Sequence, residues 1–187
     1  MGKSASGKDS IYRRLFENRG LAFKPLVTYT TRPIRSGETQ GVEYHFTDIT
    51  GMKALEEKGL IIESRVYHTV HGDWYYFTAD DGKVSIKEDN YLIVTTPEAF
   101  KKLKAYYGAE YVHPIYIEVE DGLRLSRALE RERMQKEPKY KELCRRFLAD
   151  ADDFSDEKLK DAGIEKRFVN TDIDSVLKEI TEWILSR

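Results

Sequence analysis

The sequence is poor in residues that build covalent cross-links or extended linkers. Its 187 residues include one cysteine, Cys144, so an intrachain disulfide is excluded and a reducing cytoplasm is the expected compartment. We expect this thiol to be a half-buried helix residue. The five prolines form no proline-rich linker, and no internal repeat or low-complexity tract is found. A chain of this length can bury one good core with room for a small subdomain, so we expect one compact unit.

Long apolar runs and an excess of one charge are missing as well. Apolar stretches such as 60–62 and 92–94 are far too short to span a bilayer, and the first residues hold no apolar signal-peptide core. Lys and Arg number 31 against 33 Asp and Glu, a net charge of −2. That balance argues against general nucleic-acid affinity. The composition predicts a cytoplasmic globular protein without a nucleic-acid or membrane partner, and it leaves the oligomeric state open.

The first ten residues have the pattern of a phosphate-binding P-loop. Gly2 is followed by four residues and then by Gly7 and Lys8, the spacing of a loop that wraps a polyphosphate with its backbone N–H groups. Glycine permits positive φ and close approach to the anion, and Lys8 brings a positive charge to the terminal phosphates. Asp9 stands where a Ser or Thr hydroxyl usually meets Mg²⁺, so Asp9 or Ser10 is expected to ligate the metal. The predicted phosphate-binding residues are Gly2, Ser4, Ala5, Ser6, Gly7, Lys8, Asp9 and Ser10.

A helix is predicted directly after this loop. Ile11, Leu15 and Phe16 recur at helical spacing, and residues 18–20 form a stop signal. A loop followed by a helix is the context that phosphate binding requires; the alternative is a Gly/Ser-rich N-terminal tail. No strand is predicted before the loop, so the first strand of such a fold is missing, and we expect the natural start to lie upstream.

The rest of the chain alternates short apolar strands with helices, which is typical of an α/β fold with a mainly parallel sheet. The Tyr-rich segment 42–78 breaks the alternation and predicts an antiparallel insert, with a turn at residues 71–73. Asp48 is expected to cap the helix that follows it, and Pro97 to begin another. The predicted strands are 25–31, 42–46, 60–66, 68–78, 91–95, 113–119 and 167–169, and later helices are 97–107, 122–135, 138–150 and a closing helix.

A second motif, TTRPIRSGE, occupies residues 30–38 and is followed by Gly41, Tyr44 and Phe46. Together with the P-loop, this T-T-R-x-x-R-x-G-E-x-x-G-x-x-Y-x-F pattern resembles the guanylate kinase family. The likeness covers most of the chain, with a weak stretch in the middle, and continues at Glu63, Tyr76, Arg131, Arg146 and residues 168–170.

The resemblance implies a site for the acceptor phosphate. Two arginines three residues apart and a tyrosine hydroxyl suit a dianionic phosphate, because Arg gives forked, charge-assisted hydrogen bonds. Arg32, Arg35, Tyr44 and Tyr76 would hold it, with Tyr75 as the alternative to Tyr76. For the two arginines, the competing interpretation is an ordinary solvated loop.

The resemblance also implies a site for guanine. Glu63 matches an acid that accepts from the N1–H and the exocyclic amine of the base, whereas the alternative is an outward-facing strand residue. Thr28 and Thr78 match hydroxyl residues that help hold the base. The family usually carries an Asp-x-Asp after the next strand, and this chain has VTTPE at residues 94–98. Thr95, Thr96 or Glu98 would have to compensate, so weaker base discrimination is expected.

Arg131 and Arg146 match lid arginines that close over the transferring phosphates, with Arg133 and Arg145 as competitors. Asn170 matches a residue beside the adenine of ATP. A solvent-facing surface of mixed charge is the alternative for each arginine. Their separation is wider than usual for the family, which implies a longer lid.

The resemblance implies Mg²⁺-dependent transfer of the γ-phosphoryl of ATP to GMP, with Lys8, Arg131 and Arg146 as catalytic residues. The expected fold is a three-layer α/β sandwich with a mainly parallel sheet, an antiparallel β-rich acceptor-binding insert and a helical lid. The alternatives are a kinase for another small phosphorylated acceptor and a non-catalytic guanylate-kinase-like interaction module. The expected core spans 1–31 and 91–187 with the lid at about 122–150, the insert 32–78, and a connector 79–90.

Overall fold

The computed structural model describes residues 1–69 and 72–187, and the chain forms two compact units. The expectation of one compact unit is corrected by this division. Residues 22–31 and 79–93, expected in the core or the connector, belong to the second unit. The reason is that the strand after the first helix pairs with a strand near residue 90. The first unit comprises Met1–Leu21, Val94–Lys101 and His113–Arg187, and the second comprises Ala22–Ile93 and Lys102–Val112.

The first unit combines a two-stranded parallel sheet with helices. In that sheet Ile117 lies opposite Phe168, and both side chains are buried. The closing helix is capped by Asp172, whose carboxylate accepts from the Ser175 N–H, and it buries Val176 on its apolar face. The elements are α1 (Lys8–Glu17), β7 (Tyr116–Glu118), α4 (Asp121–Arg133), α5 (Tyr140–Asp153), α6 (Asp156–Asp161), β8 (Arg167–Val169) and α7 (Ile173–Leu185), and α3 (Pro97–Tyr107) contributes residues to both units.

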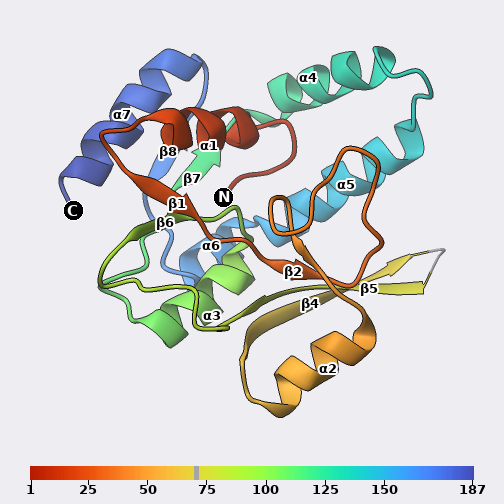
Figure 1. The fold of residues 1–187 in the computed structure, drawn as a ribbon. Helices are drawn as coiled ribbons and strands as arrows, with labels where there is room; N and C mark the ends of the chain where they lie inside the picture. The colour runs from red at the N-terminus through yellow and green to blue at the C-terminus, as the bar shows by residue number, and fades with distance from the viewer. Residues whose placement is uncertain (70–71) are drawn as a thin grey trace. The chain divides into compact units, whose positions relative to one another are not determined.

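The two long helices α4 and α5 run beside each other in the first unit (Figure 1). They correspond to the helices predicted over 122–135 and 138–150. Cys144 lies on α5 and is exposed, so the expectation of a half-buried thiol is wrong: the buried position on this helix is its neighbour Leu143. Helix α6 was not predicted, because six residues with one buried side chain, Leu159, carry little periodic signal.

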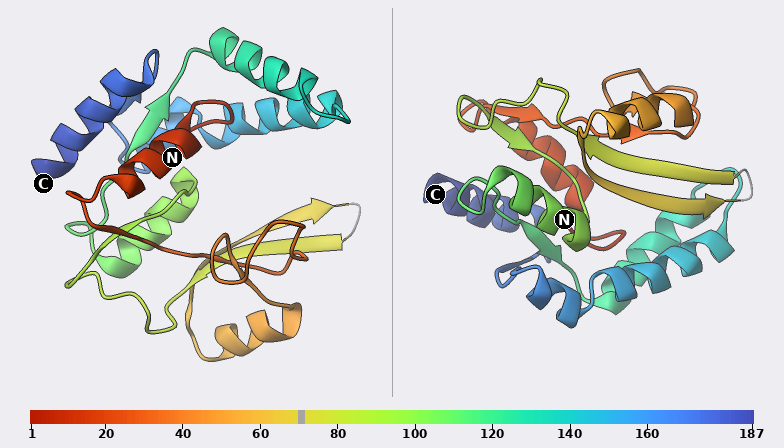
Figure 2. Two further views of the ribbon diagram at one scale, coloured as in Figure 1. Left: turned by 45° about the horizontal axis from the view of Figure 1, so that its top comes forward. Right: turned by 90° about the horizontal axis from the view of Figure 1, so that it is seen from below.

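The second unit contains a mixed four-stranded sheet and a separate parallel pair. The sheet has the order β3-β2-β5-β4, and α2 covers one face of it (Figure 2). On that face Met52 packs against Phe77 and Ala79. As predicted, α2 is capped by Asp48, which accepts from the Gly51 N–H at 2.7 Å. The elements are β1 (Phe23–Pro25), β2 (Tyr29–Thr30), β3 (His45–Phe46), α2 (Ile49–Glu57), β4 (Ile61–Thr69), β5 (Gly72–Ala79) and β6 (Asn90–Leu92).

Several strand predictions need correction. The predicted insert is not purely antiparallel, because β2 and β3 pair in parallel. The predicted strand 42–46 shrinks to its last two residues, since Gly41 has a φ of 80° and a turn follows it. The predicted mainly parallel sheet is observed as two parallel pairs, β1–β6 and β7–β8, one in each unit. The turn predicted at 71–73 includes His71, which lies outside the described residues.

Candidate functional site

The first site element is the loop of residues 1–7, which leads into α1. Gly7 is left-handed at φ 83°, and a Cβ there would collide with the side-chain amide of Asn170. A Cβ on Gly2 would lie 2.7 Å from the carbonyl oxygen of Ile117. Gly7 is therefore required by its left-handed conformation and by its contact with the Asn170 side chain, and Gly2 by its close approach to the backbone of Ile117.

Asn170 is a structural partner of this loop. Its Nδ2 donates to the carbonyl oxygen of Ser6 at 2.8 Å, and both residues are buried. Ala5 adds a left-handed conformation at φ 62°, which costs a non-glycine residue on the order of 1–2 kcal/mol. Left-handed turns of this kind point successive N–H groups inward and form an anion-binding concavity. The Ser6 hydroxyl is buried and has no hydrogen-bond partner within the described part of the chain.

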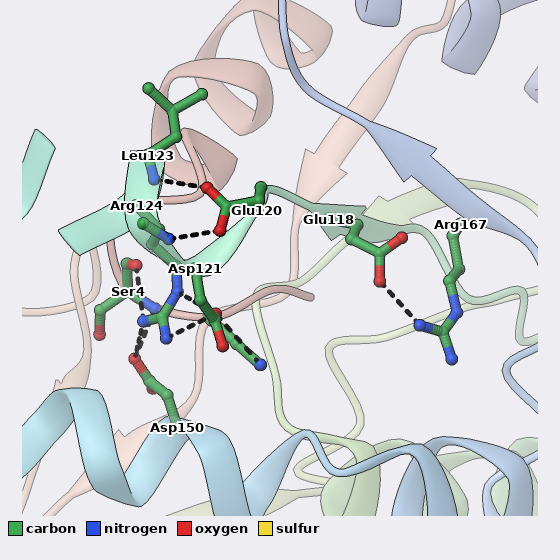
Figure 3. Close-up of polar contacts among 10 residues, drawn as sticks. Ser4, Glu118, Glu120, Asp121, Leu123, Arg124, Asp150 and Arg167 are labelled. Atoms are coloured by element: carbon green, nitrogen blue, oxygen red, sulfur yellow. Dashed lines mark hydrogen bonds and ion pairs between the residues drawn. The ribbon is translucent and has the colours of Figure 1, made fainter. Parts of the chain in front are cut away.

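The loop is also tied to the helices α4 and α5 by a buried arginine that the sequence analysis did not single out. Arg124 is 1% exposed and donates to the Ser4 carbonyl oxygen and to Asp150, both at 3.3 Å (Figure 3). Asp150 accepts in turn from the Ser4 N–H at 2.7 Å. Arg124 also donates to Asp121 and lies over the ring of Phe147, 4.0 Å from its centroid. The backbone C=O and N–H of Ser4 are thus both held by the ion pair of Arg124 and Asp150.

Lys8, Asp9 and Ser10 form the first turn of α1. The ammonium of Lys8 lies 3.7 Å from Asp9, whose carboxylate is exposed, and Ser10 is exposed as well. No group of three His, Cys, Asp or Glu side chains suited to a metal exists among the described residues. Mg²⁺ keeps several waters and binds through one or two carboxylates plus phosphate oxygens. A single open carboxylate beside the predicted phosphate loop fits that coordination.

The predicted lid arginines share one hollow. Arg131 from α4 and Arg146 from α5 both line it, and both side chains are exposed. Glu142 also lines the hollow. Two nitrogens of Arg145 donate to its carboxylate oxygens at 2.7 and 2.8 Å, and these hydrogen bonds lower the pKa of the Glu142 carboxyl. Of the described residues, those lining the hollow are Arg131, Glu132, Gln135, Lys136, Glu137, Lys139, Glu142 and Arg146, without the competitors Arg133 and Arg145.

In the second unit, Arg32 is buried and held by its own loop. Its guanidinium forks onto Glu38 at 2.5 and 2.7 Å and lies over the rings of Tyr44 and Phe46. The ion pair with Arg32 lowers the pKa of Glu38 to about 2. The solvated-loop alternative is therefore wrong for Arg32, whereas Arg35 is exposed.

Strand alternation separates the two candidate tyrosines. Tyr75 packs with the core cluster around Phe77, on the face covered by α2. Tyr76 points to the other face, where its ring lies 5.5 Å from that of Tyr44. Burial raises the pKa of Tyr44. Of the two, Tyr76 is the one on the side of Arg32 and Tyr44.

Glu63 lies on the same face of the sheet. It is 3% exposed and accepts from the Thr78 hydroxyl at 2.8 Å and from Nε of Arg65 at 3.1 Å. The alternative of an outward-facing strand residue is therefore wrong. Arg65 was missed by the sequence analysis, although its position two residues after Glu63 on a predicted strand places both on one face.

The structure gives hydrogen bonds for two further predicted residues, Thr28 and Thr96. The carbonyl oxygen of Thr28 accepts from the His45 N–H at 2.8 Å and so helps join β3 to β2. Thr96 accepts from the Ala99 N–H at 3.4 Å at the start of α3. Thr95, Thr96 and Glu98 belong to the first unit and Glu63 to the second, so compensation by these residues stays a prediction.

Residues 1–186 match the family model described as guanylate kinase. The chain belongs to the guanylate kinase family. It is 33% identical over 92 residues to the guanylate kinase of Sulfurimonas denitrificans, covering 49% of this chain and 43% of that protein. It is 40% identical over 70 residues to the guanylate kinase of Chromohalobacter salexigens, covering 37% of this chain and 32% of that protein. The matched region thus spans less than half the length of these curated relatives.

The fold agrees with this guanylate kinase assignment. The crystal structure of guanylate kinase from Anaplasma phagocytophilum superposes with a TM-score of 0.62, covering 99% of this chain and 82% of that one at 24% identity. The α/β class predicted from the sequence is thereby confirmed. Within the described residues, no helix is long and apolar enough to cross a membrane.

Proposed function

We propose that the chain transfers the γ-phosphoryl group of ATP to GMP, giving ADP and GDP. The observation that carries this proposal is one face of the second unit, which holds two buried charged side chains. Arg32 lies there with Tyr44 and Tyr76, and Glu63 lies there with Thr78. A forked cation and tyrosine hydroxyls suit a phosphate dianion. A buried carboxylate suits the N–H donors of guanine. The P-loop of the first unit supplies the matching donor site.

Catalysis in this proposal is positioning and charge neutralisation, because phosphoryl transfer requires no covalent intermediate. The loop amides and Lys8 hold the ATP phosphates, and Arg131 and Arg146 close over them. Arg32 exchanges Glu38 for the acceptor phosphate, with Arg35 as a second cation. Asp9 or Ser10 would hold Mg²⁺, which would add positive charge beside the phosphate oxygens.

A second candidate is a kinase for another small phosphorylated acceptor. It is favoured by the stretch 94–98, which lacks the second base-reading acid expected from the resemblance. We also propose a cytoplasmic location and no nucleic-acid partner, on the near-neutral charge balance.

The test is a coupled ADP-release assay with ATP·Mg²⁺ and GMP, dGMP, AMP, UMP or CMP as acceptor. We expect turnover confined to GMP and dGMP, and a loss of about 10²–10³ in kcat for Lys8→Met, since one preorganised charge is removed. Turnover with a different nucleotide would favour the second candidate. Peptide binding without any phosphoryl transfer would point to an interaction module.

A further inference from the structure

Glu63 and Arg65 form an ion pair inside the second unit. They stand two residues apart on β4 and so project from the same face, opposite Thr78 and Tyr76 of β5. Nε of Arg65 lies 3.1 Å from Oε2 of Glu63, and a terminal nitrogen lies 3.4 Å from Oε1. The carboxylate is 1% exposed, whereas the arginine side chain is 20% exposed. A ligand that reaches this carboxylate therefore also meets the guanidinium.

The pair has spare hydrogen-bonding capacity on both sides. A guanidinium carries five N–H donors, and the structure shows two of the Arg65 nitrogens directed at Glu63. A carboxylate offers about four acceptor sites, of which Thr78 takes one at 2.8 Å and the two Arg65 nitrogens take two more. One acceptor site stays open, and a second opens when one of the Arg65 nitrogens turns from Glu63 to the ligand. The face thus presents forked donors directly beside a carboxylate acceptor.

Guanine is the base whose edges match this arrangement. It carries the O6 and N7 acceptors next to the N1–H and 2-amino donors, and Arg forked onto O6 and N7 is a common specific contact. Adenine presents an amino donor in place of O6, and this would face the donors of Arg65. An unmatched polar group in such a site costs more binding energy than a missing apolar contact.

We infer that Arg65 is a specificity-determining residue, which donates to O6 of guanine while Glu63 accepts from the N1–H and the 2-amino group. The inference rests on the proposed use of GMP as the acceptor. In this arrangement the acidic and the basic member of one ion pair, Glu63 and Arg65 on β4, recognise different edges of the same base. Arg65 also stands opposite Tyr76, on the phosphate side of the same face, so a contact with the phosphate is the competing role.

Equilibrium binding of GMP, IMP and AMP separates these roles without requiring turnover. IMP keeps O6 and lacks the 2-amino group, and AMP lacks O6. We expect Arg65→Met to weaken GMP and IMP binding by about 10- to 100-fold and to leave AMP binding unchanged, because only O6 loses its donor. Arg65→Lys keeps a donor and is expected to restore part of the preference for GMP over AMP.

Lys53→Met is the matched control, since it removes one positive charge from an exposed position of α2 in the same unit. Circular dichroism and thermal unfolding of each variant check that it is folded. Equal weakening of GMP, IMP and AMP by Arg65→Met would overturn the inference and assign the residue to the phosphate. An unchanged GMP-to-AMP ratio would overturn it while the proposed kinase function stands. Failure of the unmodified chain to bind GMP would overturn both.

Discussion

Arg32 shows how this fold keeps a cation buried before any ligand arrives. Its two terminal nitrogens donate to the two carboxylate oxygens of Glu38, and its guanidinium carbon lies over the rings of Tyr44 and Phe46, 5.1 and 5.2 Å from their centroids. The fork to a carboxylate has the geometry that a phosphate would require. Glu38 therefore orients the side chain for its proposed ligand while satisfying its charge.

The pH dependence of stability should report this ion pair. The pKa of Glu38 is lowered from 4.5 to about 2 in the fold, so the pair stabilises the protein fully above pH 4.5, and that stability is lost as the pH falls toward 2. We expect the difference in melting temperature between the unmodified chain and Glu38→Gln to be largest near neutral pH and to shrink between pH 4.5 and 2. A difference that stays constant over this range would contradict the assignment.

Asp9 gives a prediction about the metal. Its exposed carboxylate adds a negative charge beside the proposed phosphate site, which disfavours ATP unless a cation neutralises it. We expect ATP binding by the unmodified chain to depend more steeply on Mg²⁺ than binding by Asp9→Ser. Calorimetric titrations over a Mg²⁺ series measure this, and equal affinity with and without Mg²⁺ in the unmodified chain would exclude the role.

At the scale of elements, the ion pair of Arg124 and Asp150 joins α4, α5 and the loop before α1. Removing one partner of a buried pair leaves an uncompensated charge and costs about 3–5 kcal/mol. We expect Arg124→Met and Asp150→Asn each to lower the free energy of unfolding by about that much, and the double variant by clearly less than the sum. Chemical denaturation measures all three.

The control for this cycle is Arg145→Met, which breaks the exposed pair with Glu142 on the same helix α5. Surface pairs contribute about 0–1 kcal/mol, so its effect should be small. Strictly additive effects of Arg124→Met and Asp150→Asn would show that the two side chains do not act as a unit.

Local signals explain which elements were predictable. Asp48 before α2, Pro97 at the start of α3 and the periodic apolar residues of α7 each act within a few residues, and all three helices are observed. The pairing of Arg124 with Asp150 joins positions on two different helices, so no rule based on residue spacing predicts it. The ends of the short strands also depend on pairing: β1 and β6 end together, at Pro25 and Leu92, which lie opposite each other.

The site residues divide in the same way. The resemblance assigned Arg32, Tyr44 and Tyr76, with Tyr75 as the alternative, to one phosphate site, and in the structure Arg32, Tyr44 and Tyr76 lie close together. The roles assigned to them, and to Lys8, Arg131, Arg146 and Asn170, stay predictions. Arg65 was missed because a single arginine on a strand does not by itself predict a binding role. Its ion pair with the buried Glu63 becomes evident only in the structure.

At the scale of the whole molecule, the residues proposed for ATP and for GMP fall in different compact units. A ligand that binds only the folded state stabilises the region it contacts. We therefore expect ADP alone to slow amide hydrogen exchange in the first turn of α1 and the loop before it. GMP alone should slow exchange in β4, β5 and residues 28–46. Protection by GMP of the loop before α1, without protection of β4 and β5, would contradict the assignment of the two sites.

The one thiol of the sequence makes a direct experiment possible. Cys144 is exposed on α5, the helix that also carries Arg146. A maleimide fluorophore therefore attaches at a single known place without any substitution. Its emission would follow the surroundings of this helix as nucleotides are added, so the natural sequence already contains its own labelling site for kinetic work.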